Sequence, residues 1–204
     1  MSARGPFQDR PSVRVESLAL SRGDRVLFEG LSFASAPGSY VEVRGANGAG
    51  KTSLLRAIAG FLRPSAGAIH FENTDEPTLA LHYVGHRNGL KANLSVRSHV
   101  RYWAELFGGG AAPDALERVG LAPQADLPVR ALSQGQARRL ALARLLAAPR
   151  PIWLLDEPAA ALDAQGRALV RDLVEAHCAQ GGIALAAVHE PLGLTPTHAV
   201  MLGG

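Results

Sequence analysis

Short apolar runs separated by polar or glycine-rich stretches recur along this chain of 204 residues. The runs at 152–155 and 183–188 are almost wholly apolar, which is typical of strands buried on both faces of a parallel sheet. The pattern predicts strands at residues 13–20, 30–34, 40–44, 67–71, 79–84, 152–155, 183–188 and 198–202. Because helical patterns lie between several of these strands, the sequence predicts an α/β fold with a mixed sheet core.

Helical spacing of apolar residues predicts the second class of element. Helices are expected at residues 52–61, 96–107, 112–119, 136–147 and 164–180. The helix-rich stretch from about 86 to 149 interrupts the alternation of strands and helices, and the glycines at 108–110 predict a loop inside it. The chain length fits one domain with a sizeable core.

The segment from Gly45 to Thr52 fits the pattern G-x-x-x-x-G-K-[ST] of a phosphate-binding loop. Its glycines allow a tight turn that brings backbone N–H groups against phosphate oxygens, Lys51 adds positive charge, and the Thr52 hydroxyl can ligate Mg²⁺. A glycine-rich turn that fits by chance is the alternative, but a predicted strand and a predicted helix flank the segment in the required order. The residues expected to hold ATP here are Gly45, Ala46, Asn47, Gly48, Ala49, Gly50, Lys51, Thr52 and Ser53.

Two further segments follow this loop in order. Residues 132–136, LSQGQ, have the local pattern of an N-capped helix start, with Ser133 as the cap. The apolar run at 152–155 then ends in Asp156 and Glu157, at the strand end where ligands of open α/β sheets collect. An Asp-Glu pair before a proline can also be a solvated turn, and a capped helix needs no ligand. Neither alternative explains why the three segments occur together.

In this order the segments resemble the ATP-binding-cassette (ABC) ATPases, whose signature motif LSGGQ differs from residues 132–136 only at Gln134. The resemblance implies one ATP-binding domain over residues 1–204, a P-loop NTPase with a helical subdomain at about 86–149 inserted in a RecA-like core. It implies that Asp156 and Thr52 hold Mg²⁺ and that Glu157 is the general base for the attacking water.

The same resemblance implies a site shared by two molecules. In the family, two cassettes pair head to tail as a homodimer, so that signature residues of one meet the γ-phosphate held by the other. The contacts implied across the dimer come from Ser133, Gly135 and Gln136, and from Asp163 in the D-loop-like segment 160–163. The resemblance also implies that His189 is the switch histidine. A lone histidine after a strand is more often a structural residue, but its place past Glu157, with one helix between, favours the switch role.

Departures from the family pattern narrow the assignment further. Arg22 stands where an adenine-stacking aromatic is usual, and its guanidinium can stack on the base instead. His86 takes the place of the Q-loop glutamine and is a candidate catalytic residue. Together with the segments 27–33, 89–91 and 181–183, these departures look like the haem exporter ATPases of cytochrome c biogenesis. That subfamily implies a peripheral protein on the cytoplasmic face of the inner membrane, bound to integral membrane permease subunits, in which ATP hydrolysis drives haem export or release of haem-loaded chaperone.

Composition excludes some other classes. A net charge of +3 is slight for a nucleic-acid-binding protein, so no nucleic-acid partner is expected. Four arginines interleave with leucines at helical spacing and are interpreted as the polar face of a packed helix: Arg138, Arg139, Arg144 and Arg150. No stretch reaches the roughly eighteen apolar residues of a spanning helix, and the first residues carry no hydrophobic signal region, so a soluble cytoplasmic protein is expected. His177 and Cys178 are adjacent on a predicted helix and face different directions, which argues against a shared ligand.

Three rival functions remain open from sequence. The ATPase of another exporter, for peptide, lipid or drug, would keep every motif, although Arg22 and His86 argue against it. A soluble ABC protein of DNA repair or translation normally needs a coiled coil or two cassettes in one chain. A nucleotide-gated module without hydrolysis is opposed by Glu157 and His189.

Overall fold

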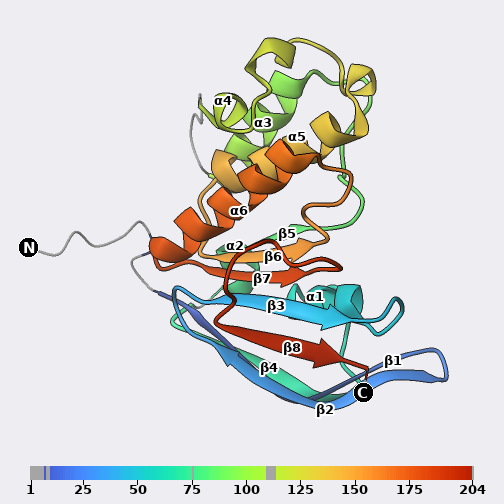
Figure 1. Ribbon diagram of the computed structural model, residues 1–204. Helices are drawn as coiled ribbons and strands as arrows, with labels where there is room; N and C mark the ends of the chain where they lie inside the picture. The colour runs from blue at the N-terminus through green and yellow to red at the C-terminus, as the bar shows by residue number, and fades with distance from the viewer. Residues whose placement is uncertain (1–6, 8–9, 75, 109–113, 204) are drawn as a thin grey trace, which may run out of the picture. The chain divides into compact units, whose positions relative to one another are not determined.

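The computed structural model describes residues 7, 10–74, 76–108 and 114–203, which divide into two compact units (Figure 1). The first, called here the sheet unit, comprises Met1–Tyr83, Arg150–Glu157 and Arg171–Gly204. The second, the helical unit, comprises Val84–Pro149 and Pro158–Val170. The bounds of the helical unit therefore include the whole stretch 86–149, together with a segment that begins directly after Glu157.

The sheet unit contains two sheets. A three-stranded antiparallel sheet has the order β2-β1-β4, and a five-stranded sheet has the order β5-β6-β7-β3-β8, in which β6–β7, β7–β3 and β3–β8 are parallel pairs. The strands are β1 (Ser12–Arg22), β2 (Arg25–Ser35), β3 (Tyr40–Gly45), β4 (Ala66–Glu72), β5 (Leu81–Val84), β6 (Ile152–Asp156), β7 (Ile183–Ala187) and β8 (His198–Leu202). The expected mixed sheet core is confirmed.

The core of the sheet unit forms where α1 (Lys51–Ile58) packs on the five-stranded sheet. Leu54, Leu55 and Ile58 recur at helical spacing on one face of α1, and all three are buried against Val41 and Val43 of β3. Burying a leucine or isoleucine side chain is worth about 1.5–3 kcal/mol, so this contact fixes the start of α1 beside the end of β3. The phosphate-binding segment lies between these two elements.

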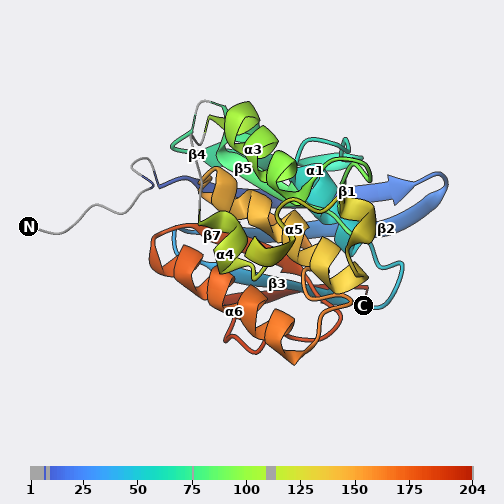
Figure 2. The ribbon, with the colours of Figure 1, turned by 90° about the horizontal axis from the view of Figure 1, so that it is seen from above.

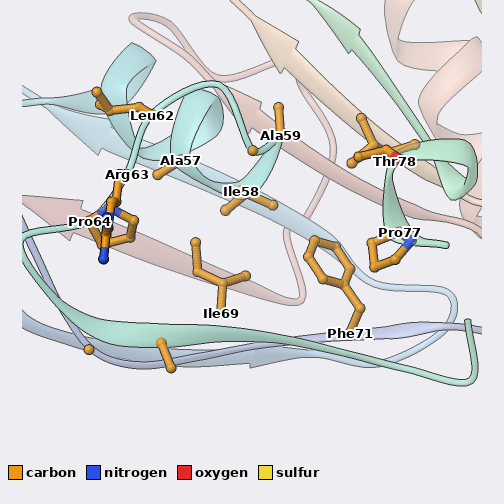
Figure 3. A pocket seen from close by; sticks show the side chains of 14 residues that line it. Ala57, Ile58, Ala59, Leu62, Arg63, Pro64, Ile69, Phe71, Pro77 and Thr78 are labelled. Carbon is orange, nitrogen blue, oxygen red and sulfur yellow. The ribbon is translucent and has the colours of Figure 1, made fainter. Parts of the chain in front are cut away.

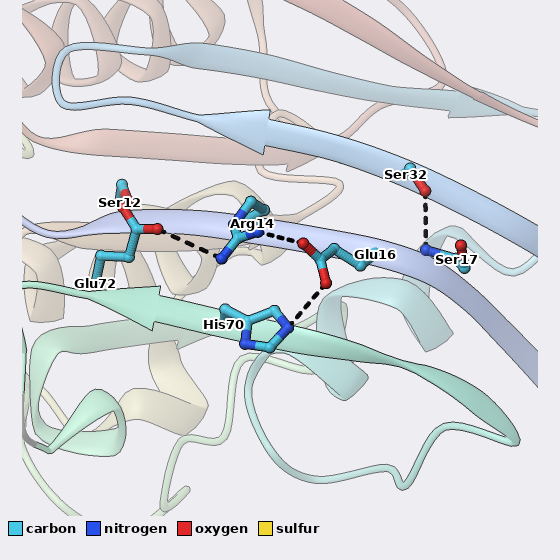
Figure 4. A network of polar contacts seen from close by, with 7 residues as sticks. All are labelled: Ser12, Arg14, Glu16, Ser17, Ser32, His70 and Glu72. Atoms are coloured by element: carbon cyan, nitrogen blue, oxygen red, sulfur yellow. Dashed lines mark hydrogen bonds and ion pairs between the residues drawn. The ribbon is translucent and has the colours of Figure 1, made fainter.

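The outer face of the three-stranded sheet is polar (Figure 4). Arg14 pairs with Glu16 in its own strand and with Glu72 of β4 at 3.6 Å, and His70 lies 3.2 Å from Glu16. These side chains are between 42% and 54% exposed. Exposed ion pairs of this kind contribute about 0–1 kcal/mol each, so the sheet is held by its buried face rather than by this network.

An open apolar hollow of about 500 Å³ lies between the end of α1, β4 and the short helix α2 (Pro77–Ala80). Ile58, Ile69 and Phe71 line it (Figure 3), and Arg63 lies at its edge. Phe61, in the turn that follows α1, is 61% exposed and contacts Tyr83 edge to face. Apolar surface is therefore left uncovered on this side of the sheet unit.

The helical unit has its own core, in which α3 and α4 pack against α5 (Figures 1 and 2). Trp103, Leu116 and Leu140, one from each helix, meet in this core. Its helices are α3 (Val96–Phe107), α4 (Ala115–Arg118), α5 (Gln134–Ala147) and the 3-10 turns Ala122–Gln124 and Val129–Ala131, while α6 (Ala164–Ala179) runs from this unit into the sheet unit. Among the described residues, none of the helices is long and apolar enough to cross a bilayer.

Several predicted boundaries are wrong. The strand expected at 30–34 runs from Arg25 to Ser35, because pairing with β1 extends it to a tight turn at 23–24. The strand expected from 79 begins at Leu81, since α2 occupies the preceding residues. The helix expected to reach 61 ends at Ile58. Of the helix expected at 112–119, the described residues 114–119 contain the shorter helix α4 (Ala115–Arg118), whereas 112–113 and the loop residues 109–110 lie outside the described residues.

The four arginines expected on a polar helix face include two that are buried. Arg138 in α5 is 3% exposed, and Arg150, which lies beyond the helix end, is 8% exposed. Arg150 donates to the carbonyls of Thr78 and Leu81, and burial lowers the pKa of its guanidinium. The helical spacing misled the interpretation because long cationic side chains can be buried when carbonyl oxygens receive their N–H groups.

His177 of α6 is buried between aromatic rings and not beside a second ligand. Its ring stacks on Trp153 with centroids 3.7 Å apart, and Nε2 contacts the carbonyl oxygens of Pro151 at 3.1 Å and Ile183 at 3.3 Å. Burial lowers the pKa of His177 to about 4, against the opposing effect of these two carbonyls. The neutral imidazole therefore links the residue before β6 to the first residue of β7.

We predict that His177 makes folding stability depend on pH. Its pKa is about 4 in the folded chain and about 6.5 when unfolded, so its contribution is complete above pH 6.5 and is lost as the pH falls towards 4. The loss amounts to about 3 kcal/mol, which denaturant titrations between pH 4 and 7 would detect. His177→Phe keeps a ring on Trp153 and His177→Gln keeps a donor, and neither titrates in this range. Both variants should show a shallower decline, and an unchanged decline would contradict the assignment.

Candidate functional site

The phosphate-binding segment is a loop that leaves β3 and enters α1. Gly45 ends the strand with φ 149°, and a Cβ atom there would lie 2.4 Å from the carbonyl oxygen of Leu202 in β8. Gly50 precedes the helix in the left-handed conformation, with φ 104°, and contributes no side-chain cap. Neither position accepts another residue without strain, and the first N–H groups of α1 have no capping side chain from Gly50.

Lys51 folds back over this loop. Its ammonium group donates to the carbonyl oxygens of Gly45 at 2.7 Å and Ala46 at 3.1 Å, and the residue is 7% exposed. The loop residues 46–48 are exposed. A helix N-terminus, the ammonium group of Lys51 and an accessible backbone turn are the features that favour binding of an anion such as phosphate.

The hydroxyl of Thr52 donates to Oδ1 of Asp156 across 3.0 Å. Asp156 ends the fully buried strand β6 and is itself 2% exposed, whereas Thr52 is exposed. Mg²⁺ holds its oxygen ligands at about 2.0–2.1 Å in octahedral geometry, so adjacent ligands lie about 2.9 Å apart. The spacing and the chemistry of these two oxygens therefore fit Mg²⁺.

Glu157 follows directly and has an unusual backbone. Its φ is 50°, in the left-handed region, and its N–H donates to the carbonyl of Ala187 across 2.9 Å. A residue other than glycine costs about 1–2 kcal/mol in this conformation, so the neighbouring strand and not local preference places it. The turn directs the chain sharply away from the buried end of β6.

His189 lies two residues beyond the end of β7 and is exposed. Asp156 and Ala187 are register partners in the parallel pair β6–β7, so Glu157 and Val188 leave the same edge of the sheet on adjacent strands. The sheet unit thus brings the loop after β3, the carboxylates of Asp156 and Glu157, and the segment that carries His189 to one edge of the sheet.

Arg22 is the last residue of β1 and is exposed beside its cross-strand partner Arg25. Sequence reasoning found no aromatic residue near this position, but the structure shows that Phe28 of β2 approaches the phosphate loop. A Cβ atom built on Gly50 would lie 3.2 Å from Cδ1 of the Phe28 ring. The alternation of apolar and polar residues along β2 predicts a half-buried aromatic side chain, but it does not identify the loop that the Phe28 ring contacts.

The signature segment forms the start of α5 in the helical unit. Ser133 accepts a hydrogen bond from the Gln136 N–H at 3.2 Å, and the Gln136 side chain accepts one from the Ser133 N–H at 2.9 Å. This capping box confirms the predicted N-cap. A Cβ atom on Gly135 would lie 3.3 Å from the carbonyl of Ala161, so the signature glycine faces the segment that precedes α6.

Asp163 caps the first turn of α6. Its carboxylate accepts from the Gly166 N–H at 2.8 Å and from Arg139 of α5 at 3.1 Å. The hydrogen bond from Gly166, with a further contribution from Arg139, lowers the pKa of Asp163. The signature helix and the D-loop-like segment are therefore linked by an ion pair inside the helical unit.

Arg138 is a buried residue that the sequence analysis did not include among the candidate site residues. Its guanidinium donates to the carbonyls of Gly85 at 2.8 Å and Pro158 at 3.2 Å, and to Oδ1 of Asn88 at 3.0 Å. Arg138 therefore ties α5 both to the loop that carries the exposed His86 and to the residue after Glu157. Gly85 and Pro158 lie 53 and 20 residues from Arg138 in the sequence, so no local pattern predicts these contacts.

Comparison with known proteins places the chain among nucleotide-binding subunits of transporters. The ABC transporter family matches residues 28–160. The chain is 50% identical over 178 residues to the cytochrome c biogenesis ATP-binding export protein CcmA of Rhodopseudomonas palustris (strain BisB5), covering 85% of this chain and 89% of that protein. It is 44% identical over 200 residues to the protein of the same name from Rhizobium johnstonii, covering 93% of each.

Two solved structures share the fold. A putative ABC transporter ATP-binding protein from Pyrococcus furiosus superposes with a TM-score of 0.81 at 24% identity, covering 94% of this chain and 97% of that one. The cbiO1 protein of Clostridium perfringens, part of the ABC transporter complex cbiONQ, superposes with a TM-score of 0.72 at 28% identity, covering 87% and 78%. The expected fold class is confirmed.

We predict that Lys51→Ala weakens ATP binding at least about tenfold. The substitution removes the cation held over the loop in the ground state as well as in the transition state. Lys91→Ala is the matched control, because it removes the other lysine of the chain from an exposed position. Titration with a fluorescent ATP analogue would measure both. Equal affinity in the two variants would show that Lys51 does not meet the phosphates.

Proposed function

Since this chain belongs to the ABC transporter family of ATP-binding proteins, we propose that it is the ATP-hydrolysing subunit of a membrane complex of cytochrome c biogenesis. The observation that carries the hydrolytic part is the Thr52–Asp156 contact at 3.0 Å, with Glu157 next in sequence. The cytochrome part rests on relatives named as export proteins of cytochrome c biogenesis, which cover most of both chains. Export of haem or release of a haem-loaded chaperone is the work that we assign to hydrolysis.

In the proposed reaction, the α1 N-terminus and Lys51 hold the β- and γ-phosphates of ATP. Mg²⁺ bound by Thr52 and Asp156 would draw charge from the phosphate oxygens. Glu157 accepts the proton of the water that attacks the γ-phosphorus, while the bond to the β-phosphate oxygen breaks and ADP leaves. His189 contacts the γ-phosphate side of the site, and Arg22 stacks on adenine.

We assign the remaining site residues to a second copy of the chain. Ser133, Gly135 and Gln136 open a capped helix in the helical unit, and Asp163 lies beside them through Arg139. The proposed head-to-tail homodimer sets these residues of one protomer against the ATP held by Lys51 of the other. Both units of the chain then act as one ATP-binding domain. His86 takes the place of the Q-loop glutamine as a candidate catalytic residue.

The proposed partners in the membrane are permease subunits, so that the chain is peripheral, on the cytoplasmic face of the inner membrane. Exposed apolar surface in the sheet unit supports such a contact. Phe61 and Leu79 are 61% and 59% exposed, and each is next in sequence to a residue that lines the apolar hollow of Figure 3, Leu62 and Thr78 respectively. Apolar groups gathered on a surface often mark sites where another protein binds.

We predict that Glu157→Gln abolishes ATP turnover and leaves ATP binding within about twofold of wild type. The carboxylate acts only when water attacks, whereas Lys51 and the loop amides hold the nucleotide beforehand. The ATP-bound dimer should therefore accumulate, as size-exclusion chromatography with light scattering would show. Hydrolysis within a few-fold of wild type would remove Glu157 from the role of base.

A second variant tests the head-to-tail arrangement of the dimer. Ser133→Arg places a large cation at the start of α5, so a Glu157→Gln, Ser133→Arg double variant should bind ATP as a monomer. Formation of the normal ATP-dependent dimer by the double variant would contradict the head-to-tail arrangement.

We predict that a Lys51→Ala allele stops maturation of c-type cytochromes and leaves b-type cytochromes intact. The proposed complex requires hydrolysis and not only the presence of the subunit, and b-type cytochromes hold haem without covalent attachment. Haem staining of denatured membrane proteins would report the c-type products, and reduced-minus-oxidised spectra the b-type. Normal covalent attachment would refute the cytochrome assignment and leave the ATPase assignment intact. A Lys91→Ala allele is the control.

A further inference from the structure

One face of β3 is polar, although the strand lies inside the five-stranded sheet. Tyr40, Glu42 and Arg44 alternate along this face, while Val41 and Val43 on the other face join the hydrophobic core. Space for the polar side chains comes from small register partners on the neighbouring strands, Ala184, Ala186 and Ala199. Glu42 is therefore buried inside the sheet unit and pairs with Arg44, which directly precedes Gly45 of the phosphate loop.

Both oxygens of the Glu42 carboxylate have hydrogen-bond donors, and its side chain is 0% exposed. Oε2 accepts from Nε of Arg44 at 2.7 Å, and Oε1 accepts from the hydroxyl of Tyr40 at 2.8 Å. Burial, together with the hydrogen bond to Glu42, raises the pKa of Tyr40, so the hydroxyl remains a donor. The N–H of Leu192 also reaches Oε1, at 3.4 Å.

Leu192 belongs to the connection between β7 and β8, which carries His189. This connection is anchored to β3 at its two ends: the Val188 N–H donates to the carbonyl of Val43 at 3.1 Å, and Thr197 exchanges backbone and hydroxyl hydrogen bonds with Tyr40 at 2.7 and 3.1 Å. The bond from Leu192 to Glu42 is an anchor between those ends.

We propose that Glu42 is a positioning residue for His189 in ATP hydrolysis, an inference that rests on the proposed role of His189. The Leu192 N–H bond to Glu42 holds the backbone three residues after His189. Removal of the carboxylate takes this hydrogen bond away, so the segment that carries His189 has more backbone freedom to lose when His189 meets the γ-phosphate side of the site. Small losses of orientation at a reacting group lower the rate strongly.

The fold does not depend on this carboxylate. Val41 and Val43 continue to hold β3 in the core, and backbone pairing with β7 and β8 is unaffected by the side chain. Arg44 is 38% exposed and can turn its guanidinium towards water when its partner is removed. Glu42→Ala is therefore expected to fold, and circular dichroism would check it.

The test measures single-turnover hydrolysis and ATP affinity separately. Glu42→Ala should lower the hydrolysis rate about tenfold with ATP affinity within about twofold of wild type. Glu42→Gln keeps an acceptor for the Leu192 N–H and should retain the rate within about threefold of wild type. Hydrogen–deuterium exchange should show faster exchange at the Leu192 amide in Glu42→Ala only. Glu72→Ala is the matched control, because it removes an arginine-paired glutamate from the exposed face shown in Figure 4, and it should change none of these readouts.

The His189→Ala background separates a positioning role from a general structural one. If Glu42 acts through His189, adding Glu42→Ala to His189→Ala lowers the residual rate by less than about twofold. A full further tenfold loss would overturn the inference, as would a wild-type rate in Glu42→Ala or an equal loss of rate and affinity. If Glu42→Ala fails to fold, Tyr40→Phe, which removes one donor to the same carboxylate, should show the smaller loss of rate in its place, and a wild-type rate there would overturn the inference. His189→Ala with wild-type activity would instead refute the proposed role of His189.

Discussion

The parallel pairing of β3 with β7 on one side and with β8 on the other is the interaction on which the sheet unit depends. The register places Val43 opposite Ala187 and Gly45 opposite Leu202, so β3 ends where both neighbours end. Because parallel strands present their carboxyl ends at one edge, the phosphate loop begins beside the chain that leaves β7. Asp156 reaches the same edge through the pairing of β6 with β7. Three strand registers therefore bring the segments of the candidate site to one edge of the sheet.

Local signals in the sequence were sufficient where structure is local. The apolar runs that form β6 and β7 fixed two buried strands to within one residue at their ends, and the capping box at Ser133 marked the start of α5. The glycines of the phosphate loop were equally informative, since at Gly45 a side chain would meet the carbonyl of Leu202. The helix cap is set by residues next to Ser133, whereas the requirement for glycine at Gly45 comes from Leu202 of β8 and is recorded only in the loop motif.

The tertiary contacts of several residues could not be predicted from the sequence. Arg138 was assigned to a polar helix face because its spacing fits one, yet its guanidinium is buried among carbonyl oxygens from distant segments. Phe28 lies in a strand whose register with β1 shifts several times, and only the folded strand shows that its ring meets Gly50. Glu42 interrupts an apolar strand, and the donors that make its burial possible include Leu192, 150 residues away. A sequence records these residues but not their partners.

Two features of the site cost stability and are held by the core around them. Glu157 adopts a left-handed conformation that costs about 1–2 kcal/mol, and Glu42 is a carboxylate removed from water. Each takes part in a hydrogen bond that links a segment beyond a strand end to the sheet: the Glu157 N–H donates to the carbonyl of Ala187, and the Leu192 N–H donates to the carboxylate of Glu42. Such bonds contribute only about 1 kcal/mol each to stability, so their main effect is to restrict where the segments after β6 and β7 can go. If Glu157 and His189 have the roles proposed above, this restriction is what hydrolysis requires, because small losses of orientation at a group that acts while water attacks lower the rate strongly.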